Sequence, residues 1–243
     1  MLEIIQHDGP ARLGRFNEIP SPGIISSDNP FKLIKDEPVP YDIPKPLAEW
    51  SVKKTIQYAK ESSEKGMVTI HGSKYLDLRI QCARELEALG NNIFLIANSD
   101  KLIKRQKDMI KIIVTLRETL NPNSALYIPF TDLSFIPLLT YLGVDFFGNY
   151  VCDFYAKLNT IITPTSTYNL EKYPIYDFNY EEIRKYNINS LDFVIKEIRE
   201  NIKNGTLRNL VEMRCCSSPE TMTALRILDQ EYPEFLDKYT PLY

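Results

Sequence analysis

The chain has 243 residues, of which 44% are hydrophobic and 25% charged, so it can bury a substantial core as one large or two small domains. Its formal net charge of −3 excludes a globally basic nucleic-acid-binding protein, and any contact with RNA must come from a local patch. No apolar run approaches the roughly 20 residues of a membrane-spanning helix, and the N-terminus lacks the basic and apolar stretches of a signal peptide.

Residues 1–45 predict a hairpin followed by a proline-rich wrap. Asp8-Gly9 lies between two short extended stretches in residues 7–15, which is typical of a hairpin turn. Seven prolines from Pro20 to Pro46 then argue against regular structure up to about residue 46, although further strands can hide in this segment. Apolar residues such as Phe31 indicate that the segment packs on the protein and is not a free linker.

Residues 46–179 predict a repeated helix–strand core. Four helices alternate with four short apolar strands, over residues 47–65, 67–71, 74–89, 93–97, 106–120, 125–129, 133–142 and 144–147. Continuous apolar strands of this kind are typical of a parallel sheet or barrel that is covered on both faces. A further strand can lie around Ile161-Ile162.

Residues 180–243 predict a C-terminal helical segment that packs on this core, giving one domain overall. A long amphipathic helix is expected over residues 180–204, ending at Asn204-Gly205. Shorter helices over 207–213 and 219–229 and an irregular tail over 239–243 complete the expected order of elements.

Several segments, taken together and in this order, resemble the archaeal tRNA-guanine transglycosylase family. They are the opening residues 7–14, the segments 121–127, 204–212, 219–228 and 239–241, and Gly143-Val144-Asp145-Phe146-Phe147-Gly148, which is similar to the family's Gly-Val-Asp-Leu-Phe-Asp element. Within the family, the transglycosylase-like N-terminal part of archaeosine synthase alpha subunits is most similar. The resemblance implies an α/β fold, a reduced or degenerate (β/α) TIM-type barrel of the transglycosylase kind, followed by C-terminal helices.

The chain departs from the family where the family performs its chemistry. In the family, the last aspartate of the quoted element attacks the ribose carbon and holds the RNA covalently during base exchange. Here the position is Gly148, which has no side chain that could act as a nucleophile. The family's Asp-Ser-Gly-Gly-Phe-Gln acid/base motif does not occur in the sequence either. The resemblance therefore implies a protein that has lost base exchange.

The zinc site of the family is also expected to be lost. The family uses a Cys-x-Cys-x-x-Cys cluster and a later histidine, where this chain has Tyr173-Pro174-Ile175-Tyr176 and Tyr186-Asn187. Tyrosine and isoleucine do not supply the thiolate or imidazole ligands of structural zinc, so we expect no metal and no cofactor. The four cysteines show no disulfide spacing, which predicts reduced thiols and a cytoplasmic protein.

Functional groups of such barrels lie where the strands end. His71, Asn98, Asp100 and Asp145 were expected at this rim, with Tyr127 inside a strand. Asp145 and His71 are weak candidates for acid/base groups, and Asn98, Asp100 and Tyr127 are candidates for a polar pocket. The alternative, which we favour because no catalytic pair is visible, is that Asn98 and Asp100 cap a helix and His71 is a hydrogen-bonded rim residue.

A basic segment follows the second strand of the core. Residues 101–117 carry six basic side chains against one acid, Asp108. Lys101, Lys104, Arg105, Lys107 and Lys111 are therefore the candidate RNA-binding residues, the alternative being a solvated helix face. Eight aromatic residues between Tyr150 and Tyr180 either stack on unpaired bases or form core and a partner interface.

Three functions follow as hypotheses. The first is a non-catalytic transglycosylase-like subunit in archaeosine modification of tRNA. It would bind tRNA, or a partner such as a separate archaeosine synthase C-terminal subunit or the radical enzyme of archaeosine formation, and no membrane. The second is a transferase that itself adds lysine to the 7-cyano-7-deazaguanine base of tRNA. The third is a scaffold that holds partner enzymes without touching RNA.

Overall fold

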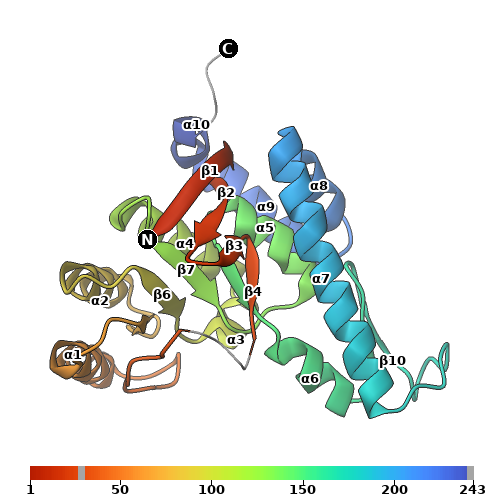
Figure 1. The fold of residues 1–243 in the computed structure, drawn as a ribbon, viewed down its shortest axis with the longest axis horizontal. Helices are drawn as coiled ribbons and strands as arrows, with labels where there is room; N and C mark the ends of the chain where they lie inside the picture. Colours follow the sequence, from red (N-terminus) through yellow and green to blue (C-terminus); the bar gives the residue numbers. More distant parts are fainter. Residues whose placement is uncertain (27–30, 240–243) are drawn as a thin grey trace.

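The computed structural model describes residues 1–26 and 31–239 (Figure 1). Pro30 and the expected irregular tail, apart from Tyr239, lie outside these residues. None of the helices in the described ranges is long and apolar enough to cross a membrane.

The N-terminus forms a small antiparallel sheet. Its order is β1 (Leu2–Asp8), β2 (Ala11–Phe16) and β3 (Ile19–Ser21). The predicted hairpin is confirmed: Asp8 pairs with Ala11, and Gly9 takes the left-handed backbone, φ +59°, that this turn requires.

The expectation of no regular structure before residue 46 is wrong at two places. Besides β3, the segment contains β4 (Gly23–Ile25), which joins the main sheet. Pro20 is tolerated because β3 is the edge strand of its sheet, where a missing N–H donor costs no ladder hydrogen bond. β3 and β4 are each only three residues long, which is too short to show the alternation of apolar and polar residues that would indicate a strand in the sequence.

The main sheet has five parallel strands in the order β4-β8-β7-β6-β5. The strands besides β4 are β5 (Met67–Ile70), β6 (Ile93–Ile96), β7 (Ala125–Ile128) and β8 (Phe146–Gly148). Beyond β5, Leu33 makes an isolated parallel bridge with Met67. Together with the helices that follow, this confirms the expected α/β fold with a reduced barrel of parallel strands and C-terminal helices.

Helices connect and cover these strands. Those within the described ranges are α1 (Lys45–Glu61), α2 (Leu76–Ala88), α3 (Ser99–Leu102), α4 (Gln106–Thr119), η1 (Leu133–Phe135), α5 (Ile136–Tyr141), α6 (Tyr150–Lys157), α7 (Tyr180–Asn204), α8 (Leu207–Cys215), α9 (Pro219–Glu231) and α10 (Pro233–Tyr239). A hairpin of β9 (Thr160–Ile162) and β10 (Thr167–Asn169) follows α6 and contains the strand expected near Ile161. The long helix α7 covers the expected residues and ends at Gly205 as predicted, and it begins at an Asn179–Glu182 capping box.

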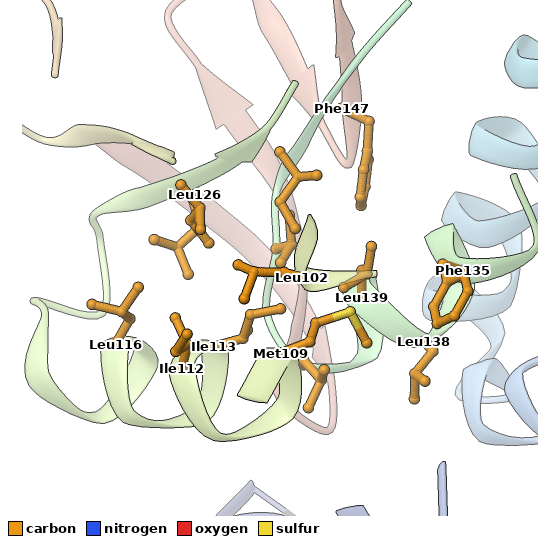
Figure 2. Close-up of a cluster of buried hydrophobic side chains, with 14 of the residues drawn as sticks. Leu102, Met109, Ile112, Ile113, Leu116, Leu126, Phe135, Leu138, Leu139 and Phe147 are labelled. Atoms are coloured by element: carbon orange, nitrogen blue, oxygen red, sulfur yellow. The ribbon is translucent and has the colours of Figure 1, made fainter. Parts of the chain in front are cut away.

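Both faces of the parallel sheet are buried, which explains why its strands are continuously apolar. On the outer face, Val68, Phe94 and Leu126 belong to the large core shared with the helices. Figure 2 shows part of this core, where Ile113 and Leu116 of α4 lie near Leu126.

The inner face of the sheet packs against the N-terminal strands. Met67, Tyr127 and Phe146 form a second buried cluster with Leu2 and Phe16. Phe16 lies edge-on to Phe146, with ring centroids 6.3 Å apart. The small antiparallel sheet therefore closes the face that a complete barrel would fill with side chains of its other strands.

A buried ion network fixes the N-terminal sheet to the core. The Asp145 side chain, 1% exposed, accepts hydrogen bonds on both oxygens from Arg12 of β2, with Nε 3.1 Å from Oδ1. The same carboxylate accepts the backbone N–H of Leu126 at 2.8 Å and lies 3.8 Å from Arg117 of α4. Burial disfavours the charged form of the Arg117 guanidinium and lowers its pKa. The negative charge of Asp145 is therefore needed to stabilise the two buried cations, Arg12 and Arg117.

Asp145→Asn keeps the shape of this side chain and removes its charge. We expect it to lower the free energy of unfolding by about 3–5 kcal/mol, because Arg12 and Arg117 stay buried without a counter-ion. Urea unfolding followed by circular dichroism measures the change. Asp77→Asn, which breaks an exposed pair with Lys45, is the control with little expected effect. Equal stability of the two variants would contradict the role given to Asp145.

Candidate functional site

The carboxyl ends of β5, β6, β7 and β8 lie at one end of the sheet, which we call the rim. His71 follows β5, and Asn98 and Asp100 follow β6, so these three reach the rim as expected. Asp145 does not. It immediately precedes β8, which begins at Phe146 and not at residue 144 as expected, and so it lies at the amino end of that strand, away from the rim.

Gly148 ends β8 at the rim, and there is no space for a side chain at this position. A Cβ atom placed on Gly148 would overlap the carbonyl oxygen of Pro129 and would lie 2.9 Å from the hydroxyl of Tyr127. Tyr127 itself is buried on the inner face of β7, and burial raises the pKa of its phenol. The backbone after β7 thus occupies the space that a longer residue at position 148 would need.

His71 and Asn98 attach residues 31–44, which we call the wrap, to the rim. His71 Nε2 lies 3.0 Å from Asp36 Oδ2, and Asn98 Nδ2 donates to the carbonyl of Val39 at 2.9 Å. His71 is 2% exposed, and its Nδ1 has no hydrogen-bond partner among the described residues. These contacts give both residues a structural role and leave no open acid/base site at His71.

Arg79 is a structural residue of the rim that sequence analysis did not single out. It is fully buried on α2 and donates to the backbone carbonyls of Ser73 at 2.8 Å and Ala97 at 3.1 Å. Burial lowers its pKa to about 10. The one sequence feature that indicates this role is the position of the arginine on the apolar side of a predicted amphipathic helix, where charged residues are rare.

The basic segment is partly neutralised. Lys101 lies 3.4 Å from Asp100, Arg105 lies 2.5 Å from Asp42, and Lys107 lies 2.8 Å from Glu231. Lys104 and Lys111 are exposed and pair with no acid among the described residues.

Arg117, the last of the six basic residues in segment 101–117, is buried in the core. The surface excess of positive charge is therefore smaller than the sequence count suggested, and Lys104 and Lys111 carry most of it.

A cavity of about 590 Å³ opens at the rim and is called the rim cavity. Five separate segments line it, after β6, after β7, in α6, in the β9–β10 hairpin and at the start of α9. Its charged lining residues are Asp100, Lys104, Asp132 and Glu220. Of the pocket candidates, Asp100 lines it, whereas Asn98 and Tyr127 do not.

The rim cavity has a fixed polar and aromatic wall. The Tyr155 hydroxyl donates to Asp132 Oδ1 at 2.8 Å, and burial together with Asp132 raises the Tyr155 pKa. The rings of Phe130 and Phe154 meet edge-to-face at 5.5 Å beside them. Phe154 and Tyr155 belong to the aromatic segment between Tyr150 and Tyr180.

The residues at the place of the family's zinc ligands do not fit zinc. Tyr173, Ile175 and Tyr176 lie in an exposed loop, and the Tyr176 ring stacks on Phe178 at 4.6 Å. Asn187 is buried and accepts the backbone N–H of Ile162 at 2.8 Å. Within residues 1–26 and 31–239, no three histidine, cysteine, aspartate or glutamate side chains are grouped to hold a metal.

Comparison with known proteins adds the following similarities. The sequence model of the queuine tRNA-ribosyltransferase family matches residues 31–182. An archaeosine synthase of Methanocaldococcus jannaschii is 34% identical over 128 residues, which are 53% of this chain and 21% of that protein. A tRNA-guanine(15) transglycosylase of Pyrococcus furiosus is 29% identical over 234 residues, 85% of this chain and 40% of that protein. The chain thus spans less than half the length of each of these relatives.

Gly148→Ala tests the close approach of Pro129. We expect a loss of about 3 kcal/mol in the free energy of unfolding, because the backbone after β7 must move to admit a methyl group. Gly205→Ala is the matched control: its Cβ meets open space, and only its left-handed backbone costs about 1 kcal/mol. Denaturant unfolding compares the two, and a smaller loss for Gly148→Ala would mean that the space is easily opened.

The attachment of the wrap should weaken in acid. Burial would raise the pKa of Asp36, but the hydrogen bond with His71, the His71 charge and smaller hydrogen bonds together outweigh burial and lower that pKa. A lowered pKa stabilises the fold above the unfolded value of about 4, and this contribution is lost as the pH falls through the folded value.

Unfolding free energies of the wild type and Asp36→Asn should therefore differ near neutral pH and converge below about pH 4. Asp177→Asn, an exposed change in another loop, controls for the removal of one charge. A difference between wild type and Asp36→Asn that does not change with pH would rule out this attachment.

Proposed function

Because the chain belongs to the queuine tRNA-ribosyltransferase family, we propose that it is a transglycosylase-like module of archaeal tRNA modification that does not exchange bases. Gly148 carries this proposal. It stands where the resemblance places the attacking aspartate, and the Pro129 carbonyl occupies the space of a side chain there. A nucleophile cannot be supplied from this position without rearrangement of the rim.

The other candidate acid/base groups support the same conclusion. The Asp145 carboxylate is engaged by Arg12 and the Leu126 N–H, and it lies away from the rim. His71 is buried against Asp36. Neither group lines the rim cavity, which disfavours the hypothesis that this chain itself transfers lysine.

We extend the proposal to cofactor and compartment. The module holds no zinc, since tyrosine and isoleucine replace the thiolates and the stacked rings of Tyr176 and Phe178 order the loop instead. Cys82, Cys152 and Cys215 are buried free thiols, which is compatible with work in the reducing cytoplasm.

Chemistry must then come from groups outside these residues. The similarity to an archaeosine synthase, of which the chain matches 21%, supports archaeosine formation as the process. We propose that a separate polypeptide, either an archaeosine synthase C-terminal subunit or the radical enzyme of that modification, supplies the reaction while this chain binds tRNA.

The first test is tRNA binding at several salt concentrations. The double variant Lys104→Glu/Lys111→Glu should bind tRNA about tenfold more weakly, with a salt slope reduced by about one for each lost phosphate contact. Lys203→Glu, at the far end of α7, is the control with unchanged affinity. Absence of binding by the wild type at low salt would favour a scaffold without RNA contact.

The second test addresses catalysis. Purified protein, incubated with tRNA carrying 7-cyano-7-deazaguanine, should yield no covalent adduct on denaturing gels and no base exchange, with or without lysine. Gly148→Asp should not restore an adduct, because the new side chain has no room beside Pro129. A trapped adduct or turnover of lysine by the wild type alone would refute the non-catalytic role.

A further inference from the structure

We propose that the rim cavity receives an arginine or lysine side chain of a partner protein. This inference rests on the proposed function, in which the chain works together with a separate polypeptide. It assigns the contact to one place, the cavity of about 590 Å³ between α3, η1, α6, the β9–β10 hairpin and the start of α9.

Charge is the first argument. Asp132 and Glu220 line the cavity beside one cation, Lys104, and a third acid, Asp100, lines it while lying 3.4 Å from Lys101. The Tyr155 hydroxyl holds Oδ1 of Asp132, and no described residue donates to Oδ2, which is left for an incoming donor. With Asp100 partly neutralised by Lys101, the lining keeps an excess of carboxylates over cations, which favours a guanidinium or ammonium group over a phosphate inside the cavity.

The walls match the rest of such a side chain. Phe130 and Phe154 place aromatic rings beside the carboxylates, where a cation and its aliphatic stem gain cation–π and apolar contact. In the β9–β10 hairpin, which also lines the cavity, the N–H and hydroxyl of Thr163 both donate to the Ser166 carbonyl, at 2.8 and 2.9 Å. These bonds fix the hairpin turn, so the cavity is formed before a ligand arrives.

An exposed apolar stripe continues from the cavity and indicates a protein as the source of the cation. Tyr150, Phe154 and Leu158 are spaced by four residues along α6 and its C-cap, with exposures of 47%, 48% and 50%. Phe154 belongs to both the stripe and the cavity wall. Figure 1 shows α6 at the lower border of the molecule. A buried basic anchor beside exposed apolar contacts is the usual anatomy of a binding hot spot.

Two small probes test the cavity in ¹⁵N-labelled protein by NMR. N-acetyl-arginine amide should shift the amides of residues 132–134, 163–167 and 218–220, whereas its neutral isostere N-acetyl-citrulline amide should not. Asp132→Asn/Glu220→Gln should weaken the arginine probe about tenfold, and Glu171→Gln/Asp177→Asn, exposed acids outside the cavity, should leave it unchanged. Equal shifts by both probes, or no effect of the cavity variant, would overturn the assignment.

A third probe tests the partner. The peptide Ac-Leu-Arg-Leu-NH₂ should bind more tightly than N-acetyl-arginine amide, and Leu158→Asp should remove this gain without affecting the smaller probe. No gain from the leucines would mean a small-molecule site, and shifts of the same amides by oligouridylate would mean an RNA site. Either result overturns the proposal. If the wild-type protein binds tRNA but does not respond to N-acetyl-arginine amide, the cavity assignment alone is refuted. If it responds to N-acetyl-arginine amide but does not bind tRNA, the proposed function alone is refuted.

Discussion

The charge of Asp145 is the constraint on which the rest of this molecule depends. One buried carboxylate binds Arg12 of the N-terminal sheet, the Leu126 amide of the parallel sheet and, at longer range, Arg117 of α4. Removing the Asp145 charge leaves Arg12 and Arg117 buried without a counter-ion. The network therefore holds the N-terminal sheet over Met67, Tyr127 and Phe146, which lets five parallel strands remain covered on both faces without the rest of a barrel.

The order of the main helices and strands could be predicted from sequence, because each has its own periodicity and end signals. The capping box at Asn179, the glycine at 205 and the Asp8-Gly9 turn are local features, and local sequence determines them. Strand β4 could not be found this way. It has three residues, follows a proline, and pairs with β8 more than 100 residues away, so its identity depends on a distant partner.

The site was predictable only where one residue type decides the outcome, as at Gly148, whose lack of a side chain is visible in the sequence. The roles of His71 and Asn98 depend on the wrap, and those of Arg105 and Lys107 on Asp42 and Glu231, which are distant in sequence. Five segments build the rim cavity, and no single one of them carries a motif. Most side-chain roles at the rim are therefore set by contacts between residues that are distant in sequence.

The isolated bridge at Leu33 limits how far apart the two edges of the main sheet can lie. Ile25 pairs at one edge of the sheet, and Leu33, eight residues later, pairs at the other. Eight residues reach at most about 28 Å, and five strand spacings laid flat span about 24 Å. The eight-residue separation therefore sets an upper limit of about 28 Å on the distance between the two edges, about 4 Å more than the flat sheet needs.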